Sequence, residues 1–241
     1  MELAVKNLAE KLDYISDVMR NNGPEEAQYQ EHLEWYNQLN HEIQNGIWTK
    51  EEIDQMRDLF GKAYKSTETL QGFVFVKPHG YAGDFEVIEK IYGKKVNRSP
   101  LYSKFDLFFQ AQSAPNAVRN RKEYFKKILK EKLAHSQKKL RVLNLASGPC
   151  RGIKEYLAGE SNHHFQIDCI DVDAKAIQHA KSLLEGSAGA ANVRFVQENI
   201  FRFKPTEQYD LIWSAGLFDY FDDKTFSRIL SRYKDSMALN G

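Results

Sequence analysis

The sequence predicts an α/β protein: a doubly wound parallel sheet in the C-terminal half and a mainly helical N-terminal half. After Gln137, short apolar runs alternate with helical segments, and this alternation favours right-handed crossovers between parallel strands. Before Gln137, apolar residues recur at spacings of three or four, the period of amphipathic helices. We therefore expect a helical region over residues 1–113 and a Rossmann-like domain over residues 114–241.

The predicted helices of the first half are separated by turn-forming residues. The spacing of apolar residues predicts helices over residues 2–20, 24–44, 50–64, 101–111 and 115–135. Residues 73–76 predict a short extended segment. Pro78, Gly80 and Gly83 then predict a shaped loop over residues 77–85, in which Asp84 occupies the N-cap position of the next helix.

The second half contains four strand candidates. They cover residues 140–146, 165–170, 193–196 and 209–214, and helices are expected over 153–158, 174–185 and 224–237. No further strand precedes the final "ALNG".

The composition excludes several classes of protein. The 34 Lys and Arg balance 33 Asp and Glu, so the net charge of +1 gives no general attraction to nucleic acid or to an anionic membrane. No apolar stretch is long enough to span a bilayer, and the first residues lack a secretion signal, so we expect a cytoplasmic protein. Cys150 and Cys169 are expected to be reduced thiols, with no metal site.

The segment "RVLNLASGPCRG" predicts a ligand loop after the first strand. Ala146, Ser147 and Gly148 are small enough for close approach of a ligand, and the helix that follows offers unpaired N–H groups. A dinucleotide is disfavoured because Pro149 and Cys150 interrupt the G-x-G-x-x-G pattern. S-adenosylmethionine has no phosphate and tolerates a looser turn. A tight connection without any ligand is the third interpretation.

The next strand ends extend this site. Asp171 is placed to accept both hydroxyls of a ribose, while Asp173 either assists it or caps the following helix. After the third strand, the side-chain oxygen of Asn199 and the backbone N–H of Ile200 suit an adenine, although Asn199 is equally suited to a turn. Ser214, at the end of the fourth strand, is a further expected cofactor contact.

With these residues in view, the second half resembles class I S-adenosylmethionine-dependent methyltransferases. The strings "KPHGYAGDFEVIEKIYG", "VLNLASGPCRG" and "YDLIWSAGLFDYFDD" resemble more specifically the bacterial 3-hydroxypalmitic acid methyl ester synthases, the extracellular-factor biosynthesis proteins. The resemblance covers residues 72–241 and implies that residues 146–148 face the methionine part of the cofactor, Asp171 the ribose, and Asn199 with Ile200 the adenine. It also implies methyl ester formation on the carboxylate of a 3-hydroxy fatty acid.

A class I sheet has seven strands in the order 3-2-1-4-5-7-6, whereas only four are predicted here. We therefore expect an incomplete sheet whose fourth strand is an open edge, which favours pairing with another chain and hence a homo-oligomer.

Methyl transfer to an ionised carboxylate needs alignment and exclusion of water, and no general base. The sequence offers three groups of acceptor-side candidates. They are Tyr81 and Asp84 in a lid over residues 77–85, Arg119 or Arg121 on the long helix, and Asp219 with Tyr220 after the fourth strand. At least one arginine is more simply explained as part of a solvated helix face, and Asp219 and Tyr220 by capping and packing.

Two alternatives to a fatty-acid methyltransferase remain at this point. One is a non-catalytic module that binds S-adenosylmethionine or a partner. The other is an N- or O-methyltransferase of another small metabolite, for which Asp84 or Asp219 would accept the proton.

Overall fold

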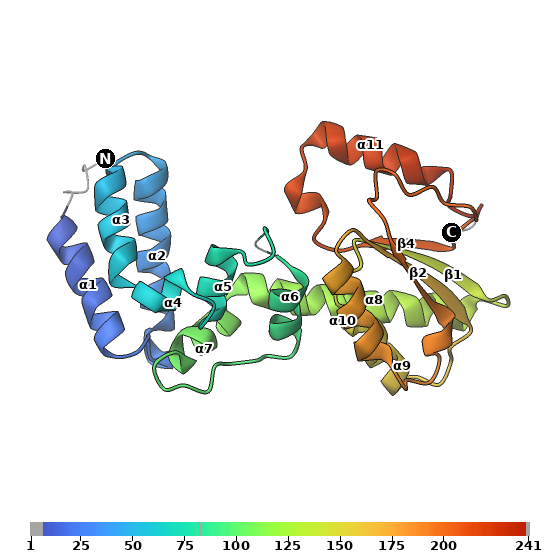
Figure 1. Cartoon of the computed structure of the whole chain (residues 1–241), viewed down its shortest axis with the longest axis horizontal. Coiled ribbons are helices and arrows are strands. Elements are labelled where there is room, and N and C mark those ends of the chain that lie inside the picture. Colours follow the sequence, from blue (N-terminus) through green and yellow to red (C-terminus); the bar gives the residue numbers. More distant parts are fainter. Residues whose placement is uncertain (1–6, 82, 240–241) are drawn as a thin grey trace. The chain divides into compact units, whose positions relative to one another are not determined.

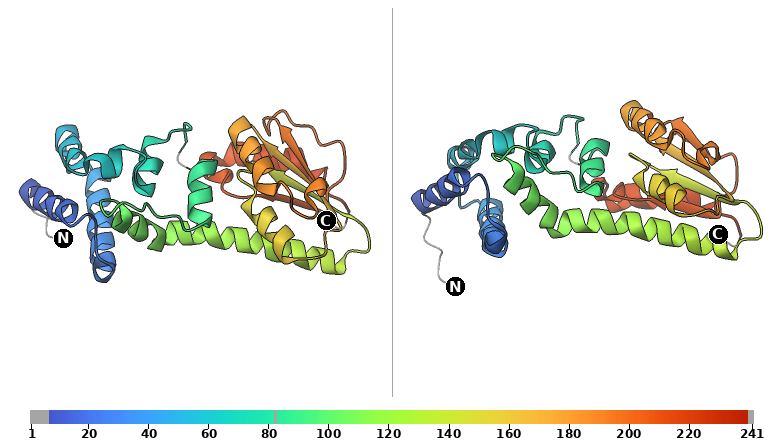
Figure 2. Two further views of the ribbon diagram at one scale, coloured as in Figure 1. Left: turned by 60° about the horizontal axis from the view of Figure 1, so that its bottom comes forward. Right: turned by 90° about the horizontal axis from the view of Figure 1, so that it is seen from below.

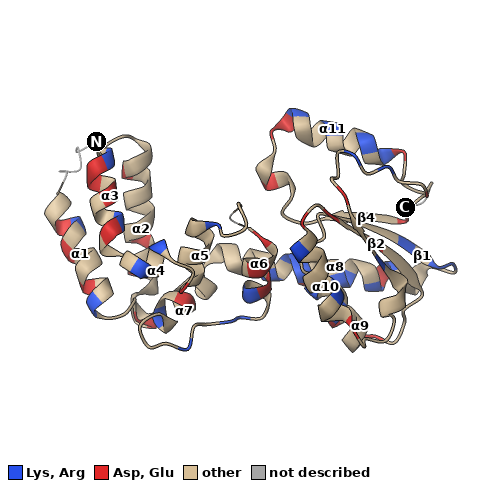
Figure 3. Ribbon diagram, viewed as in Figure 1, with Lys and Arg blue, Asp and Glu red and all other residues tan. Residues whose placement is uncertain are grey.

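The computed structural model describes residues 7–81 and 83–239, and the chain divides into two compact units at Asn116 (Figure 1). Charges of both signs are interspersed along each unit (Figure 3). No helix within the described ranges is long and apolar enough to cross a membrane.

The described part of the first unit is helical. Its helices are α1 (Leu8–Arg20), η1 (Glu26–Gln28), α2 (Tyr29–Gln44), α3 (Lys50–Leu59), α4 (Gly61–Lys65), α5 (Leu70–Val76), α6 (Phe85–Tyr92) and α7 (Ser103–Ala111). The side chain of Thr49 caps α3 by accepting a hydrogen bond from the Glu52 N–H. The single helix expected over residues 50–64 is interrupted at Phe60, because Gly61 adopts the left-handed region with φ 47°.

The extended segment expected over residues 73–76 is wrong, because these residues belong to helix α5. The hydroxyl of Thr69 accepts a hydrogen bond from the Gly72 N–H at 2.9 Å and so caps the helix. A Cβ on Gly72 would collide with the carbonyl oxygen of Ser66, so only glycine fits this close approach. Local capping and packing therefore override the strand preference of Phe73 and its β-branched neighbours.

A buried cluster from α1, α2, α3, α4 and α7 forms the core of the first unit. It includes Ile15, Leu39, Met56 and Phe105. His32 is also buried, with Nδ1 2.9 Å from the Tyr14 hydroxyl, and burial lowers the pKa of His32 to about 4. This histidine is therefore neutral at physiological pH.

The second unit is an α/β domain, as predicted. Helix α8 (Ser113–His135) begins in the first unit and runs unbroken into the second (Figure 2). The elements that follow are β1 (Leu140–Leu145), α9 (Arg151–Gly159), β2 (Phe165–Asp171), α10 (Ala174–Leu184), η2 (Ala190–Asn192), β3 (Val193–Gln197), β4 (Leu211–Ser214), η3 (Phe218–Tyr220) and α11 (Asp223–Lys234). The strands are parallel in the order β3-β2-β1-β4.

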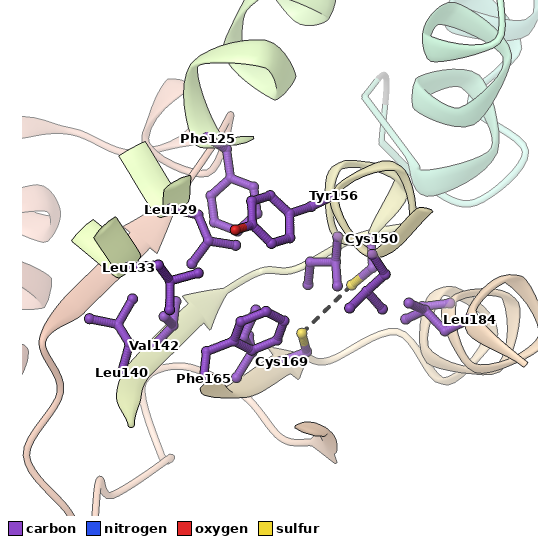
Figure 4. Packing of buried hydrophobic residues seen from close by; sticks show 14 residues of the cluster. Phe125, Leu129, Leu133, Leu140, Val142, Cys150, Tyr156, Phe165, Cys169 and Leu184 are labelled. Carbon is purple, nitrogen blue, oxygen red and sulfur yellow. Dashed lines mark hydrogen bonds between the residues drawn. The ribbon is translucent and has the colours of Figure 1, made fainter. Parts of the chain in front are cut away.

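Helices cover both faces of this sheet. On one face, Phe125 and Leu129 of α8 pack with Val142 of β1 and with residues of α9 and α10 (Figure 4). On the other face, Leu143 of β1 belongs to a second cluster with Ile229 of α11. Adjacent residues of β1 thus face opposite clusters, as the alternation of side chains along a strand requires.

Two free thiols lie in the first of these clusters. The sulfur atoms of Cys150 and Cys169 are 3.7 Å apart, and both side chains are buried (Figure 4). Burial raises the pKa of the Cys169 thiol, so this group stays protonated at neutral pH.

A buried carboxylate joins three segments of the sheet. Asp168 of β2 accepts hydrogen bonds from Arg194 of β3, at 2.8 Å from Nε and 2.7 Å from Nη2. It accepts a third bond, 2.7 Å long, from the hydroxyl of Tyr209, just before β4. Burial alone would raise the pKa of Asp168, but the bonds from Arg194 and Tyr209 outweigh it and lower this pKa.

The outer side of β4 is only partly paired. Met237 pairs with Tyr209 as an isolated parallel bridge, in which the Tyr209 N–H donates to Ser236 and the Ala238 N–H to Tyr209. Within residues 7–81 and 83–239, no strand accompanies Leu211–Ser214 on the side away from β1. Its side chains are accordingly only half-buried.

Candidate functional site

The loop after β1 has an unusual backbone. Ala146, Gly148 and Cys150 all adopt the left-handed region, with φ values of 51°, 55° and 56°. Left-handed residues other than glycine are uncommon and concentrate at functional turns. Here they form the turn that carries the chain from β1 into α9, which begins at Arg151.

Hydrogen bonds fasten this loop to the end of β2. The Ser147 N–H donates to the carbonyl oxygen of Ile170 at 3.0 Å, and the Gly148 N–H donates to Oδ2 of Asp171 at 2.9 Å. The loop and the acid predicted to bind the cofactor therefore lie in direct contact.

Asp171 occupies the last position of β2, and only 7% of its surface is exposed. Its second oxygen, Oδ1, accepts a hydrogen bond from the Asp173 N–H at 2.9 Å. Burial raises the pKa of Asp171, and these backbone bonds offset the effect in part. Each carboxylate oxygen can accept a further bond, so Asp171 has capacity for two ligand hydroxyls.

Two observations test whether this edge fits a nucleoside cofactor. The Ser147 hydroxyl is buried and has no hydrogen-bond partner among the described residues. On the Cβ side of Gly148, no atom of the described residues other than its two chain neighbours lies within 4 Å. An unsatisfied donor beside open space is typical of a ligand site. The residues present therefore fit a nucleoside cofactor. The Ser147 hydroxyl and the open space at Gly148 belong to the loop that contacts the Asp171 carboxylate.

Val172 is a candidate that the sequence reasoning missed. Its side chain is 64% exposed, directly after Asp171 at the carboxyl end of β2. An apolar side chain in solvent between two acids is suited to contact with a flat ring such as adenine. The sequence could have indicated this, because Val172 lies between Asp171 and Asp173 just beyond the end of a strand, where an apolar side chain is not buried in the core.

Asn199, after β3, is a turn residue in this structure. Its side-chain oxygen accepts a hydrogen bond from the Phe201 N–H at 2.8 Å. The neighbouring Glu198 N–H donates to the Asp171 carbonyl oxygen at 3.0 Å, which keeps this turn beside the end of β2. Ile200 is buried, and its carbonyl oxygen accepts a bond from Tyr233.

Asp173 and Ser214 have structural partners. The Asp173 carboxylate accepts a hydrogen bond from the Lys175 N–H at 2.8 Å and caps α10, the second of its two predicted roles. The Ser214 hydroxyl donates to the carbonyl oxygen of Leu145 at 3.1 Å across adjacent strands. Both residues still lie at the carboxyl edge of the sheet.

On the acceptor side, the structure separates the two arginines of α8. Arg121 lies against the loop after β4, since a Cβ on Gly216 would be 2.5 Å from its Nη1 atom. Arg119 is half-buried, two residues away along the helix, and so points in a different direction. Asp219 and Tyr220 lie in η3 and are exposed.

Tyr81 and Asp84 belong to the first unit, whereas the residues described above belong to the second. Asp84 is fully buried and caps α6, with Oδ1 accepting from the N–H groups of Glu86 and Val87 at 2.8 and 3.1 Å. Burial raises the pKa of Asp84. Tyr81 is half-buried, and residue 82 of the same loop lies outside the described residues.

Comparison with known proteins gives a family match within the second unit. Residues 142–241 match the model of a methyltransferase domain family. No curated protein gives a significant match.

Among solved structures, a possible exported protein from Bordetella parapertussis is 19% identical with a TM-score of 0.62, over 96% of this chain and 68% of that one. S-adenosylmethionine-dependent methyltransferases from Thiobacillus denitrificans and Geobacter sulfurreducens, both bound to S-adenosylhomocysteine, are each 18% identical. Their TM-scores are 0.38 and 0.37, over 48% of this chain and 45% of theirs. Of these three structures, only the Bordetella protein has a TM-score high enough to bear on the fold, and at 19% identity it supports the architecture alone.

The family match and the strand order β3-β2-β1-β4 agree on the second unit. Residues 142–241 are thus similar in sequence to a methyltransferase domain family, and they form a sheet with the Rossmann-like strand order β3-β2-β1-β4.

Proposed function

We propose that this methyltransferase acts on the carboxylate of a 3-hydroxy fatty acid and forms its methyl ester. The observation that best supports binding of the methyl donor is the contact between Asp171 and the loop of residues 146–148. The acceptor class is supported by the strings "GYAGDF" and "GLFDYF", and by an unpaired arginine at the carboxyl end of β4. A small-molecule acceptor and a cytoplasmic location fit the near-zero net charge.

Each part of the proposed cofactor site has a distinct partner. Asp171 accepts the ribose hydroxyls, and Val172 contacts the adenine ring that Asn199 and Ile200 recognise. Ala146, Ser147 and Gly148 face the methionine part, where the Ser147 hydroxyl finds the partner that it lacks among the described residues. Asp173 and Ser214 contribute at the rim while keeping their structural hydrogen bonds.

The bound cofactor supplies an activated methyl group on a sulfonium. The task of the protein is then to orient the acceptor and to exclude water, because a carboxylate is already ionised at neutral pH. We assign this orientation to Arg121 or Arg119 on α8 and to Asp219 and Tyr220 after β4. In the first unit we propose Tyr81 and Asp84, within a lid over residues 77–85, and expect Asp84 to act by holding its loop through the cap of α6.

The test is turnover with matched acceptors. S-adenosylhomocysteine and the methyl ester should form from S-adenosylmethionine with 3-hydroxyhexadecanoate, and not with its amide. Formation of ester identifies the acceptor class. Binding of S-adenosylmethionine without turnover on either acid or amine acceptors would contradict the proposal and favour a non-catalytic module, while turnover on amines alone would favour another small metabolite.

The partly paired side of β4 favours one further role. We propose that it pairs with a second copy of this chain. Sedimentation analysis that gives a monomer at all concentrations would contradict self-association.

A further inference from the structure

The basic residues of α8 differ in whether they have an ion-pair partner. Lys122 and Lys126 pair with Glu155 of α9 at 2.6 and 3.0 Å, and Lys130 pairs with Glu160 at 2.6 Å. Arg121 has no ion pair with any described residue. These three lysines thus pair with α9 or with the residue that follows it, whereas the guanidinium of Arg121 has no ion-pair partner among the described residues.

Arg121 lies at the carboxyl edge of the sheet. Four residues later on the same helical face, Phe125 contacts Trp213 of β4, with ring centroids 5.2 Å apart. One turn earlier, the guanidinium of Arg121 reaches Gly216, two residues beyond the end of β4. Gly216 has φ 79° and no Cβ, which gives the guanidinium its place against the backbone.

The Nε atom of Arg121 is buried and has no hydrogen-bond partner among the described residues. Buried donors are almost always satisfied, and a charged donor is the most costly to leave unpaired. A guanidinium held in this way presents a fork that matches a carboxylate. Asp171 lies on the far side of β1, at the end of β2, and so leaves this position to a ligand.

We infer that Arg121, and not Arg119, binds a ligand carboxylate at the carboxyl end of β4. The inference rests on the proposed function, in which two ligands would each bring a carboxylate to this edge. One is that of the fatty-acid acceptor and the other is that of the methionine part of the cofactor. Both have the same chemistry, and ligand pairs that differ in the carboxylate alone distinguish them.

The experiment compares Arg121→Gln and Arg121→Lys with Lys127→Gln, an exposed charge on the same helix that serves as the matched control. Calorimetry measures S-adenosylhomocysteine against S-adenosyl-3-thiopropylamine, which lacks only the carboxylate. With the cofactor site saturated, it then measures 3-hydroxydecanoate against 3-hydroxydecanamide, which replaces the carboxylate by a neutral amide.

Arg121→Gln should weaken one carboxylate ligand by at least about tenfold while leaving its neutral analogue unchanged. Arg121→Lys should lose less affinity for that ligand, because lysine keeps the positive charge but lacks the planar guanidinium that forms two parallel hydrogen bonds. If Arg121→Gln weakens the binding of 3-hydroxydecanoate, Arg121 binds the acceptor carboxylate. If it weakens the binding of S-adenosylhomocysteine, Arg121 binds the cofactor carboxylate. Lys127→Gln should change neither.

Equal weakening of carboxylate and neutral ligands would show a merely structural role and overturn the inference. An unchanged affinity for both carboxylates would overturn it as well. Failure of the proposed function is distinguishable, because wild-type protein would then bind S-adenosylhomocysteine without forming methyl ester from any fatty acid, whatever the residue at position 121.

Discussion

At the scale of single residues, the carboxyl edge of the sheet is divided by charge. Asp171 ends β2 on one side of β1, and the unpaired Arg121 lies beyond β4 on the other. Between them, the loop of residues 146–148 offers open space and one unsatisfied hydroxyl. In the site that we propose, the acid accepts the ribose hydroxyls and the cation binds a carboxylate, so the ligands lie along this edge in one direction.

The raised pKa of Asp171 leads to a prediction for cofactor binding. Ribose hydroxyls favour the ionised carboxylate, so affinity for S-adenosylhomocysteine should fall as the pH drops toward the raised pKa. The fall should begin at a higher pH than the ordinary Asp value of 3.8 would give. Asp171→Asn should bind about tenfold more weakly at pH 7 and lose this dependence. Calorimetry between pH 5 and pH 7 measures it, and parallel pH profiles for the two proteins would contradict the role of Asp171.

The sequence predicts which candidate residues lie together better than it predicts their individual roles. Asp171 and the loop of residues 146–148 were predictable, because the ends of parallel strands meet at one edge. Whether Asn199 recognises a base or closes a turn depends on side-chain geometry that spacing does not encode. The choice between Arg119 and Arg121 depends on the packing of α8 against β4, which is a tertiary contact.

At the scale of elements, the four strands were predicted with ends within two residues of those observed. Helix α5 was missed, because Phe73 and its neighbours have strand propensity and the deciding contacts come from Thr69 and Ser66. The break between α3 and α4 was also missed, although Gly61 was its signal.

Helix α5 gives a stability prediction with a matched control. Gly72→Ala should lower the free energy of unfolding by about 1–3 kcal/mol, since the added methyl meets the Ser66 carbonyl oxygen in a packed turn. Gly159→Ala, at the end of α9 with open space around its Cβ, should be neutral or slightly stabilising. Urea unfolding measures both, and an equal effect at the two positions would contradict the close packing of α5.

The Asp168 network gives a prediction for the sheet. Asp168→Asn removes the ionic bonds to Arg194 and should cost about 2 kcal/mol at pH 7. Because the pKa of Asp168 is lowered in the folded state, this contribution is present above the ordinary value of 3.8 and is lost as the pH falls through the lowered pKa. Urea unfolding should therefore show a difference from wild type that is constant between pH 7 and pH 4 and shrinks below it. Asp235→Asn, at an exposed position, is the control.

At the scale of the whole molecule, the predicted plan of a helical half followed by a parallel sheet is confirmed. The chain consists of two compact units, and the second contains the residues that match a methyltransferase domain family. The second unit alone contains the loop, the acid and the arginine on which the proposed chemistry depends. Donor binding can accordingly be tested before the role of the helical unit in acceptor choice.

The most direct test of the account is calorimetric titration of S-adenosylmethionine into the full chain, with Asp171→Ala and the exposed Asp235→Ala as the variant and its control. We predict saturable binding by the wild type and by Asp235→Ala, and weakening of at least about tenfold in Asp171→Ala. Absence of binding by the wild type, or equal binding by all three proteins, would contradict the cofactor site at the carboxyl edge of this sheet.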